Sequence, residues 1–277
     1  MVPPKSPPRG AVPGPWLEYR GGWESVPGEI IEETLVTLYV NGRDVATIMC
    51  TPKDQGWLAL GFLKNEGLLS DLGEVELLFL SRDGCCADVW LNRPFRKPDR
   101  EIITSGCGGG ITFDDPSIDL DPVTEDLRLE PETLFPLFNA LHQRDSLHAR
   151  ARGVHAAGLS DGREILVMVE DVGRHNTIDK LVGACLELGI EPRGRILLAT
   201  GRVSSEMLRK GARMGCPIIA SRNSPTSMSV AMARAWNITL VGYVRQGSMR
   251  VYAHPERLGY ETDLSDSQPV TIRAQGA

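Results

Sequence analysis

The chain has 277 residues, 24% of them charged, and its formal net charge is −6, from 30 basic against 36 acidic side chains. This length allows one large domain or two small ones. An acidic chain is a poor general binder of nucleic acid, so any anion-binding site must be local. The longest apolar runs have five or six residues, far short of the roughly 20 that a membrane-spanning helix needs.

The two ends of the chain have the composition of unfolded tails. Residues 1–15 contain six prolines and no apolar core, so this segment is neither a signal peptide nor a folded element. Polar residues dominate from Glu261 to Ala277. We therefore predict disordered tails over residues 1–29 and 261–277.

A first α+β region is predicted over residues 30–116. Strand-like runs lie on both sides of Asn41-Gly42, a pair that is typical of a tight hairpin turn. Thr51 is a good N-cap and Pro52 suits the first helical position, which predicts a helix from there to about Glu66. The predicted strands are Ile31–Val40, Val45–Cys50, Val75–Leu80 and Ala87–Leu91.

This first region ends in a glycine-rich loop around Cys107. Six of the seven residues from Ser105 to Ile111 are small, and four of them are glycine. Such a backbone can expose a thiol and turn several N–H groups toward it, which lowers the thiol pKa and favours the thiolate. On composition alone, a reactive thiol and a flexible linker with an incidental cysteine are equally good interpretations.

The other cysteines show no pattern of a reactive or metal-binding site. No pair has C-x-x-C spacing, and without a secretion signal we expect reduced thiols in the cytoplasm. Cys85 and Cys86 follow an Arg-Asp-Gly turn and, as neighbours in a strand, should point to opposite faces. Cys50, Cys185 and Cys216 lie in or beside apolar segments, which is typical of inert core residues.

A second region, over residues 131–258, alternates strands and helices. It opens with a predicted helix, Pro131–Arg144, and a hairpin through Ser160-Asp161-Gly162. The alternation predicts an α/β fold with a mainly parallel sheet and helices on both faces. The later helices are predicted to begin near Asn176, Ser204 and Thr226, and the strands lie near residues 164–169, 195–199, 217–220 and 238–243.

Each of those four strands is followed by an arginine near its carboxyl end. In sheets of this kind the ligand crevice lies at the carboxyl ends of the strands. Arginine binds phosphate bidentately, and neighbouring Gly, Ser and Thr residues let backbone amides approach it. One such arginine alone is more often solvated, but four together predict a site for a nucleotide-like phosphate compound. They are Arg174, Arg202, Arg222 and Arg245.

The turn that carries Arg174 is the most charged of the four. Asn176 is a good N-cap with Asp179 three residues on, so Arg174 and His175 are expected just before a helix N-terminus. Unpaired amides and the helix dipole favour an anion there, with His175 as a further donor. A capped turn with a surface salt bridge is the structural alternative.

The histidines do not form a metal-site pattern. His155 and His175 are the best placed for acid–base work or metal binding, although a lone histidine beside a strand is more often structural. A zinc hydrolase of the nucleobase deaminase type needs H-x-E followed by P-C-x-x-C. His155-Ala156-Ala157 lacks the glutamate and the chain has no C-x-x-C, so we predict no catalytic metal.

Segments spread over about Ile30 to Leu258 match the pattern of one known family. The most specific is D-V-G-R-H-N followed by D-K-L within Glu170–Lys180. The others are Thr51-Pro52-Lys53-Asp54, Leu60-Gly61-Phe62, Glu66-Gly67, Arg195–Arg202 with Ser204-Ser205-Glu206-Met207, Met232–Arg245 and Val251–Leu258. In these segments the chain resembles the FdhD family, the formate dehydrogenase accessory sulfurtransferases.

The resemblance implies a cytidine-deaminase-like three-layer α/β/α fold, a homodimer and a cytoplasmic location. It also implies a sulfur relay. A cysteine desulfurase loads a persulfide onto a loop cysteine, and the sulfur passes to the molybdenum (or tungsten) bis-guanine-dinucleotide cofactor required by formate dehydrogenase. That cofactor, Mo-bis(molybdopterin guanine dinucleotide), is a bound substrate in such a relay, and no intrinsic metal is implied.

The resemblance assigns roles to particular residues. The family loop often reads G-C-x-x-C, and Cys107 matches its first cysteine, the persulfide carrier, while Gly110 stands at the second. A mechanism with two loop thiols is therefore unsupported unless Cys85 or Cys86 replaces the missing one. The family's cofactor-binding segment matches Tyr243, Val244, Arg245, Gln246, Gly247 and Ser248.

Two other functional classes stay open at the sequence level. A non-catalytic chaperone could bind the dinucleotide cofactor and the dehydrogenase while Cys107 is only structural, and Gly110 in place of the second loop cysteine favours it. A metal-dependent deaminase is the weaker alternative. The sequence does not distinguish a molybdenum from a tungsten client.

Overall fold

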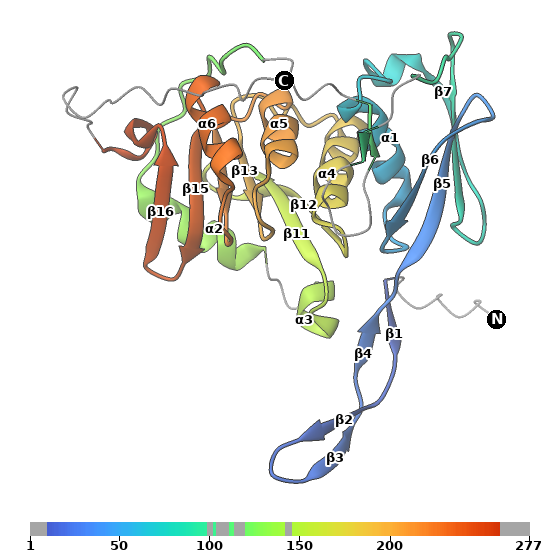
Figure 1. The fold of residues 1–277 in the computed structure, drawn as a ribbon, viewed down its shortest axis with the longest axis horizontal. Coiled ribbons are helices and arrows are strands. Elements are labelled where there is room, and N and C mark those ends of the chain that lie inside the picture. Colours follow the sequence, from blue (N-terminus) through green and yellow to red (C-terminus); the bar gives the residue numbers. More distant parts are fainter. Residues whose placement is uncertain (1–9, 99–101, 104–110, 114–119, 142–145, 261–277) are drawn as a thin grey trace, which may run out of the picture.

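A computed structural model of the chain describes residues 10–98, 102–103, 111–113, 120–141 and 146–260. Two β-sheets stand side by side with helices α1 and α4 between them, and a narrow β-ribbon projects from the body (Figure 1). No helix in these ranges is long and apolar enough to cross a bilayer.

The larger sheet has six strands, and only its central part is parallel. The pairs β13–β14 and β14–β15 are parallel, whereas β11 is antiparallel to β12 and β13, and β15 is antiparallel to β16. The sheet is therefore mixed and not mainly parallel as the sequence predicted, because β11 runs against both of its neighbours and a hairpin joins β15 to β16. In spatial order the strands are β12 (Ile165–Asp171), β11 (His155–Ser160), β13 (Ile196–Ala199), β14 (Ile218–Ser221), β15 (Thr239–Arg245) and β16 (Ser248–Ala253).

Helices cover both faces of this sheet, as the sequence predicted. Alternate residues of β13 face opposite sides: Leu197 packs with helices α4, α5 and α6, and Leu198 packs with α2. The predicted 131–144 helix appears as a short 3-10 turn followed by α2, and residues 142–145 lie outside the described ranges. The helices are η2 (Pro131–Thr133), α2 (Leu134–Ala140), α3 (Leu147–Ala151), α4 (Arg174–Leu188), α5 (Ser205–Arg213), α6 (Ser227–Ala235) and η3 (Pro255–Leu258).

The smaller sheet confirms the strands predicted for the first region. Asn41 and Gly42 form the expected turn, with φ angles of 51° and 72°. One face packs on α1 through apolar side chains such as Leu38 and Leu58. In spatial order the strands are β6 (Arg43–Cys50), β5 (Thr34–Val40), β8 (Cys86–Leu91) and β7 (Val75–Leu80); α1 spans Gln55–Asn65 and η1 spans Leu72–Glu74.

The start of α1 differs from the prediction. Asp54 precedes the first helical residue, and Thr51 is not the N-cap. Thr51 instead bonds across the molecule: its N–H donates to Asp171 at 3.0 Å, and its hydroxyl accepts the N–H of Val172 at 3.1 Å. Because these long-range bonds occupy the polar groups of Thr51, this residue does not cap the helix, which begins at Gln55.

A second hairpin frames the glycine-rich segment. β9 (Ile102–Ile103) pairs antiparallel with β10 (Ile111–Thr112), so residues 104–110 connect two paired strands. Cys107, the predicted persulfide carrier, lies outside the described residues, and so do Gly110 and residues 261–277.

Residues 10–31 form a β-ribbon, which corrects the predicted disordered tail (residues 1–29) from residue 10 on, while residues 1–9 lie outside the described ranges. Arg150 of α3 holds Glu29 at the base of the ribbon through bonds of 2.6 and 2.7 Å. Pro13 ends a strand, where a missing N–H is tolerated, so proline content did not exclude pairing. β1 (Ala11–Pro13) pairs with β4 (Glu29–Ile31), and β2 (Trp16–Tyr19) pairs with β3 (Trp23–Val26).

Two glycines let α1 and α4 touch backbone to backbone. A Cβ at Gly61 of α1 would overlap the carbonyl oxygen of Asp179, and one at Gly183 of α4 would overlap that of Trp57. No side chain could move aside to relieve either overlap. The close approach therefore requires glycine at both positions and fixes the two sheets relative to each other.

We expect Gly61→Ala to lower the free energy of unfolding by about 3 kcal/mol, because the added methyl group would force α1 away from α4. Urea unfolding measures the change. Gly22→Ala is the matched control, since a Cβ there meets no atom within 4 Å. An equal effect of both substitutions would contradict the packing argument.

Candidate functional site

The four arginines predicted at strand ends lie at one edge of the larger sheet. Because β11 is antiparallel to both β12 and β13, the strands β12, β13, β14 and β15 all run in the same direction. The antiparallel strand β11 therefore begins at this edge, where His155 pairs with Asp171. We call the following residues the strand-end cluster: His155, Arg174, His175, Arg202, Arg222 and Arg245.

The ends of β12 and β13 bring two of these residues, Arg174 and His155, against Gly201. Gly201 lies so close that a Cβ there would be 2.9 Å from the Cβ of Arg174 and 3.3 Å from Nδ1 of His155. Arg174 is buried and His155 is half-buried. Burial, followed by the charge of Arg174, lowers the pKa of His155, so its ring is neutral beside the arginine at neutral pH.

Helix α4 begins two residues earlier than predicted. Gly173 is at the N-cap, and Arg174 and His175 lie in the first turn instead of before it. Asp171 explains the difference: it accepts the N–H of Gly173 and the side-chain N–H of Asn176, both at 2.8 Å. Asn176, the predicted N-cap, is instead the third residue of the helix. The positive end of the helix dipole still points toward the cluster.

His175 is neutral and is engaged within the protein. Its Nε2 lies 3.3 Å from Oγ of Ser204 and 3.5 Å from the Glu206 carboxylate. Burial, followed by the charges of Lys210, Arg174 and Arg202, lowers the pKa of His175 to about 3. The sequence suggested a further donor for the anion, but Nε2 of the ring already lies against Ser204 and Glu206 of the protein.

We expect acid to destabilise the protein through His175. Its pKa is near 6.5 when unfolded and about 3 when folded, so the unfolded chain takes up the proton first as the pH falls. Its contribution to stability is complete above pH 6.5 and is lost toward pH 3, at up to about 1.4 kcal/mol per pH unit. Urea unfolding of the wild type and of His175→Gln between pH 7 and 5 (about the range where only the unfolded histidine titrates) tests this. Parallel stability curves for the two proteins would contradict it.

Arg222 and Arg245 form the second part of the cluster, at the ends of β14 and β15. Arg222 is half-buried and donates to the carbonyl of Phe138 at 3.2 Å, while its Nε has no hydrogen-bond partner among the described residues. Burial, and then the charge of Arg245, lowers the pKa of Arg222, so two cations lie close together. Within the described ranges no carboxylate pairs with Arg202, Arg222 or Arg245. Uncompensated cations of this kind favour an anionic ligand.

The predicted binding segment Tyr243–Ser248 is the hairpin between β15 and β16. Tyr243 has a φ of 54°, unusual for a non-glycine residue, and the guanidinium of Arg250 lies 4.4 Å from its ring centroid. Arg245, Gln246, Gly247 and Ser248 are exposed at the turn. Val244 is buried in the core, so its side chain cannot reach a ligand. A strained residue next to an exposed turn is typical of a functional site.

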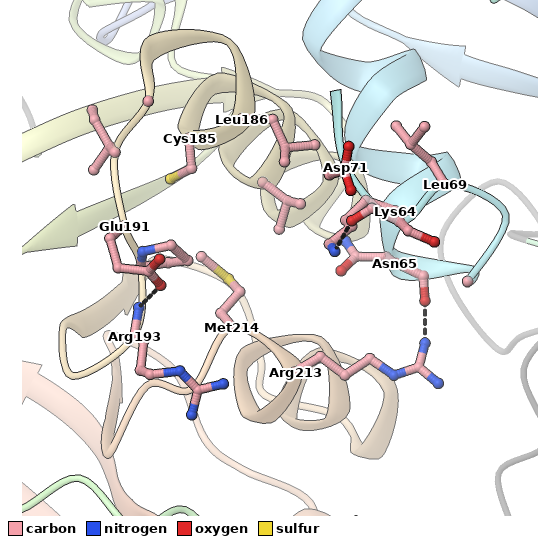
Figure 2. A pocket seen from close by; sticks show the side chains of 16 residues that line it. Lys64, Asn65, Leu69, Asp71, Cys185, Leu186, Glu191, Arg193, Arg213 and Met214 are labelled. Carbon is pink, nitrogen blue, oxygen red and sulfur yellow. Dashed lines mark hydrogen bonds between the residues drawn. The ribbon is translucent and has the colours of Figure 1, made fainter. Parts of the chain in front are cut away.

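A pocket of about 770 Å³ lies at the other end of the helices, near the C-termini of α1, α4 and α5 (Figure 2). Sequence reasoning did not predict it, since it forms only where three helices end together. Its basic side chains already have protein acceptors: Lys64 donates to the carbonyl of Ser70, Arg213 to that of Asn65, and Arg193 to Glu125. None of the predicted site residues lines this pocket.

The core positions predicted for three cysteines are confirmed. Burial raises the pKa of Cys50 and of Cys185 to about 12, and it raises that of Cys216 as well, so all three are unreactive thiols. Cys85 is exposed at the β7–β8 turn, and Cys86 is half-buried. Of the cysteines in the described ranges, Cys85 is the most exposed to solvent.

Sequence comparison places most of the chain in one group of proteins. The profile of the FdhD/NarQ family matches residues 31–259. A protein of Staphylococcus aureus (strain MRSA252) named sulfur carrier protein FdhD is 33% identical over 237 residues, which cover 83% of this chain and 89% of the relative. A protein of Staphylococcus haemolyticus (strain JCSC1435) with the same name is 34% identical over 235 residues, covering 82% and 89%.

A solved structure is also similar to this chain over most of its length. The fold matches the crystal structure of a proposed formate dehydrogenase accessory protein from Desulfotalea psychrophila with a TM-score of 0.74 and 27% sequence identity. The match covers 90% of this chain and 99% of the other.

Proposed function

The chain belongs to the FdhD/NarQ family, and from this we propose that it is a sulfur carrier in the maturation of formate dehydrogenase. The family match extends over nearly all the described residues, and the relatives cited above are named as sulfur carriers. That agreement is the observation that carries the proposal.

We propose that Cys107 carries the sulfur as a persulfide. In loading, the Cys107 thiolate attacks the outer sulfur of a cysteine desulfurase persulfide and releases the desulfurase thiolate. In transfer, the S–S bond of Cys107 breaks, the outer sulfur leaves and the Cys107 thiolate is restored. Delivery as sulfide requires two electrons, which a thiol reductant supplies. The buried, high-pKa thiols of Cys50 and Cys185 are unsuited to this chemistry.

The strand-end cluster suits a guanine dinucleotide cofactor as the bound substrate. Arg202, Arg222 and Arg245 supply positive charge without a carboxylate partner in the described ranges, which fits the phosphates of Mo-bis(molybdopterin guanine dinucleotide). The exposed turn after Arg245 offers backbone amides beside them. When bound, the cofactor supplies the redox chemistry of the client enzyme, and this chain supplies binding and orientation.

The proposal extends to location and assembly. We propose a cytoplasmic homodimer that receives sulfur from a cysteine desulfurase and serves formate dehydrogenase. The decisive experiment is the intact mass of the protein after incubation with a desulfurase and cysteine. One added sulfur per chain, removed by mild reduction, supports the sulfurtransferase.

A cofactor-binding chaperone is the second candidate, because Gly110 stands where relatives often have another loop cysteine. It predicts binding of a guanine nucleotide without any added sulfur mass. The same experiment therefore separates the two functions.

A further inference from the structure

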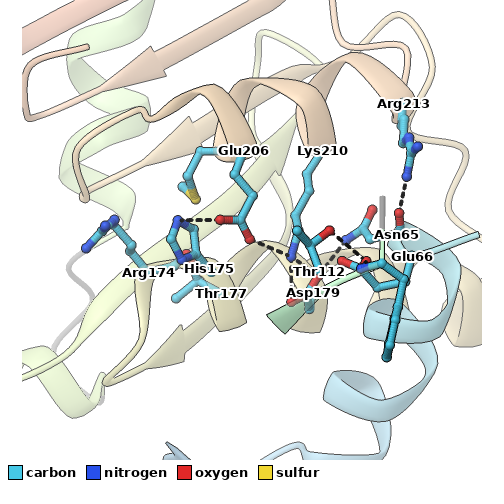
Figure 3. Close-up of polar contacts among 12 residues, drawn as sticks. Asn65, Glu66, Thr112, Arg174, His175, Thr177, Asp179, Glu206, Lys210 and Arg213 are labelled. Atoms are coloured by element: carbon cyan, nitrogen blue, oxygen red, sulfur yellow. Dashed lines mark hydrogen bonds and ion pairs between the residues drawn. The ribbon is translucent and has the colours of Figure 1, made fainter. Parts of the chain in front are cut away.

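A chain of buried and half-buried polar side chains leads from the strand-end cluster toward the β9–β10 hairpin (Figure 3). At one end, His175 faces Glu206, whose carboxylate lies 3.7 Å from Nζ of Lys210. Lys210 donates to both carboxylate oxygens of Asp179 at 2.8 Å. Asp179 also accepts a 2.6 Å bond from Asn65, the last residue of α1. Helices α4, α5 and α1 are thus joined by one connected set of polar contacts.

The next residue, Glu66, holds the hairpin. It is only 8% exposed, and one of its carboxylate oxygens accepts the hydroxyl of Thr112 at 2.8 Å and the backbone N–H of Phe113 at 2.7 Å. The ring of Phe113 packs edge-on against Phe62 of α1, with centroids 6.4 Å apart. The strand that follows the glycine-rich segment is therefore fixed to the end of α1.

The positive charge of Lys210 stabilises the buried carboxylate of Glu66. Burial opposes the charge of Lys210, but Asp179, Glu206 and Glu66 outweigh it and raise the pKa of the lysine. Burial also raises the pKa of Glu66, and the charge of Lys210 is the largest opposing influence. A buried carboxylate without a cation nearby would be costly, so the polar chain supports Glu66 electrostatically.

We propose that Glu66 is a positioning residue for sulfur transfer, which fixes the base of the hairpin containing Cys107 relative to the strand-end cluster. This inference rests on the proposed sulfur-carrier function. Cys107 is four residues from Ile103 and four from Ile111, the paired residues at the base. Glu66 therefore fixes the strand that follows the Cys107 segment, and pairing with that strand places β9 on the other side.

We expect sulfur transfer and sulfur loading to depend differently on the anchor, by which we mean the bonds from Thr112 and Phe113 to Glu66. Transfer joins two groups held by the same protein, so its rate depends on how they are placed relative to each other. Loading comes from a separate enzyme and requires only that the thiol be reachable. Loss of the anchor should therefore slow transfer and leave loading unchanged.

The test compares Glu66→Ala with Glu66→Gln, whose amide oxygen can still accept both bonds. Loading is followed by intact mass after reaction with a desulfurase and cysteine, and transfer by the activation of formate dehydrogenase at varied carrier concentration. For Glu66→Ala we expect loading within about twofold of wild type and a kcat for activation at least about tenfold lower. Glu66→Gln should restore most of the kcat.

A second pair of variants covers the case in which Glu66→Ala does not fold. Thr112→Val removes the hydroxyl donor and keeps the shape, and Thr112→Ser keeps the hydroxyl; only the valine variant should slow transfer. Hydrogen exchange at residues 111–113 measures the anchor directly and should be faster in Glu66→Ala than in Glu66→Gln.

A wild-type kcat in folded Glu66→Ala, or an equal fall in loading and transfer, overturns the positioning role. Wild-type protein that takes up no sulfur overturns the sulfur-carrier function and this role with it. In that case, the exchange difference would still show whether Glu66 anchors the hairpin.

Discussion

Cys107→Ser is expected to take up no sulfur from a cysteine desulfurase and to leave the client formate dehydrogenase inactive. A serine hydroxyl is close in size to a thiol but forms no persulfide, so the effect should be complete. The intact mass after incubation with desulfurase and cysteine, and formate oxidation by the client, measure the two consequences.

Cys85→Ser is the matched control for this experiment. Cys85 is exposed to solvent at the β7–β8 turn, so it is the described cysteine most open to a desulfurase. The Cys85 variant should load one sulfur per chain like the wild type. Maturation of the dehydrogenase by Cys107→Ser would rule out the relay through Cys107 and favour the cofactor-binding chaperone.

Removal of the arginines of the strand-end cluster should abolish nucleotide binding stepwise. A charge-assisted contact contributes about 1.5–3 kcal/mol, so Arg202→Ala, Arg222→Ala and Arg245→Ala should each weaken GDP binding roughly ten- to a hundredfold. Where the sites are independent the losses add, and the triple variant should bind at least about a thousandfold more weakly. Calorimetry with GDP gives the affinities.

Arg163→Ala is the control for this series. Arg163 is exposed in the hairpin between β11 and β12, at the opposite edge of the same sheet, so its removal changes the net charge equally but leaves the cluster intact. GDP affinity should be unchanged in this variant. Unaltered affinity in all three cluster variants would exclude the strand ends as the nucleotide site.

The sequence by itself determined the parts of the fold that depend on local pattern. The Asn41-Gly42 turn, the strands on both sides of it and the helix through Ile178, Leu181 and Cys185 follow from turn chemistry and apolar period, and the structure has them. The arginines at four strand ends were also predictable, because each lies within a few residues of the end of an apolar run.

The helix starts at Ser204 and Thr226 are confirmed, but two others were less predictable, because distant residues compete for the capping groups. Asn176 and Thr51 both have the side chains of N-caps. In the folded chain Asp171 accepts bonds from both residues, although Thr51 is 120 positions away. No local pattern reveals such a partner. The helices therefore begin at Arg174 and Gln55 and not at the predicted residues.

The buried polar chain was decided by tertiary structure alone. In the sequence, Glu66 and Lys210 look like ordinary charged residues of solvated helix surfaces. They are buried because Gly61 and Gly183 let α1 and α4 approach to backbone contact, and because α5 packs beside α4 on the same face of the sheet. Burial then makes each charge dependent on its neighbours, since an unpaired charge away from water is far more costly than one at the surface. The sequence thus determined which residue carries the proposed chemistry, and packing determined which residues hold its segment in place.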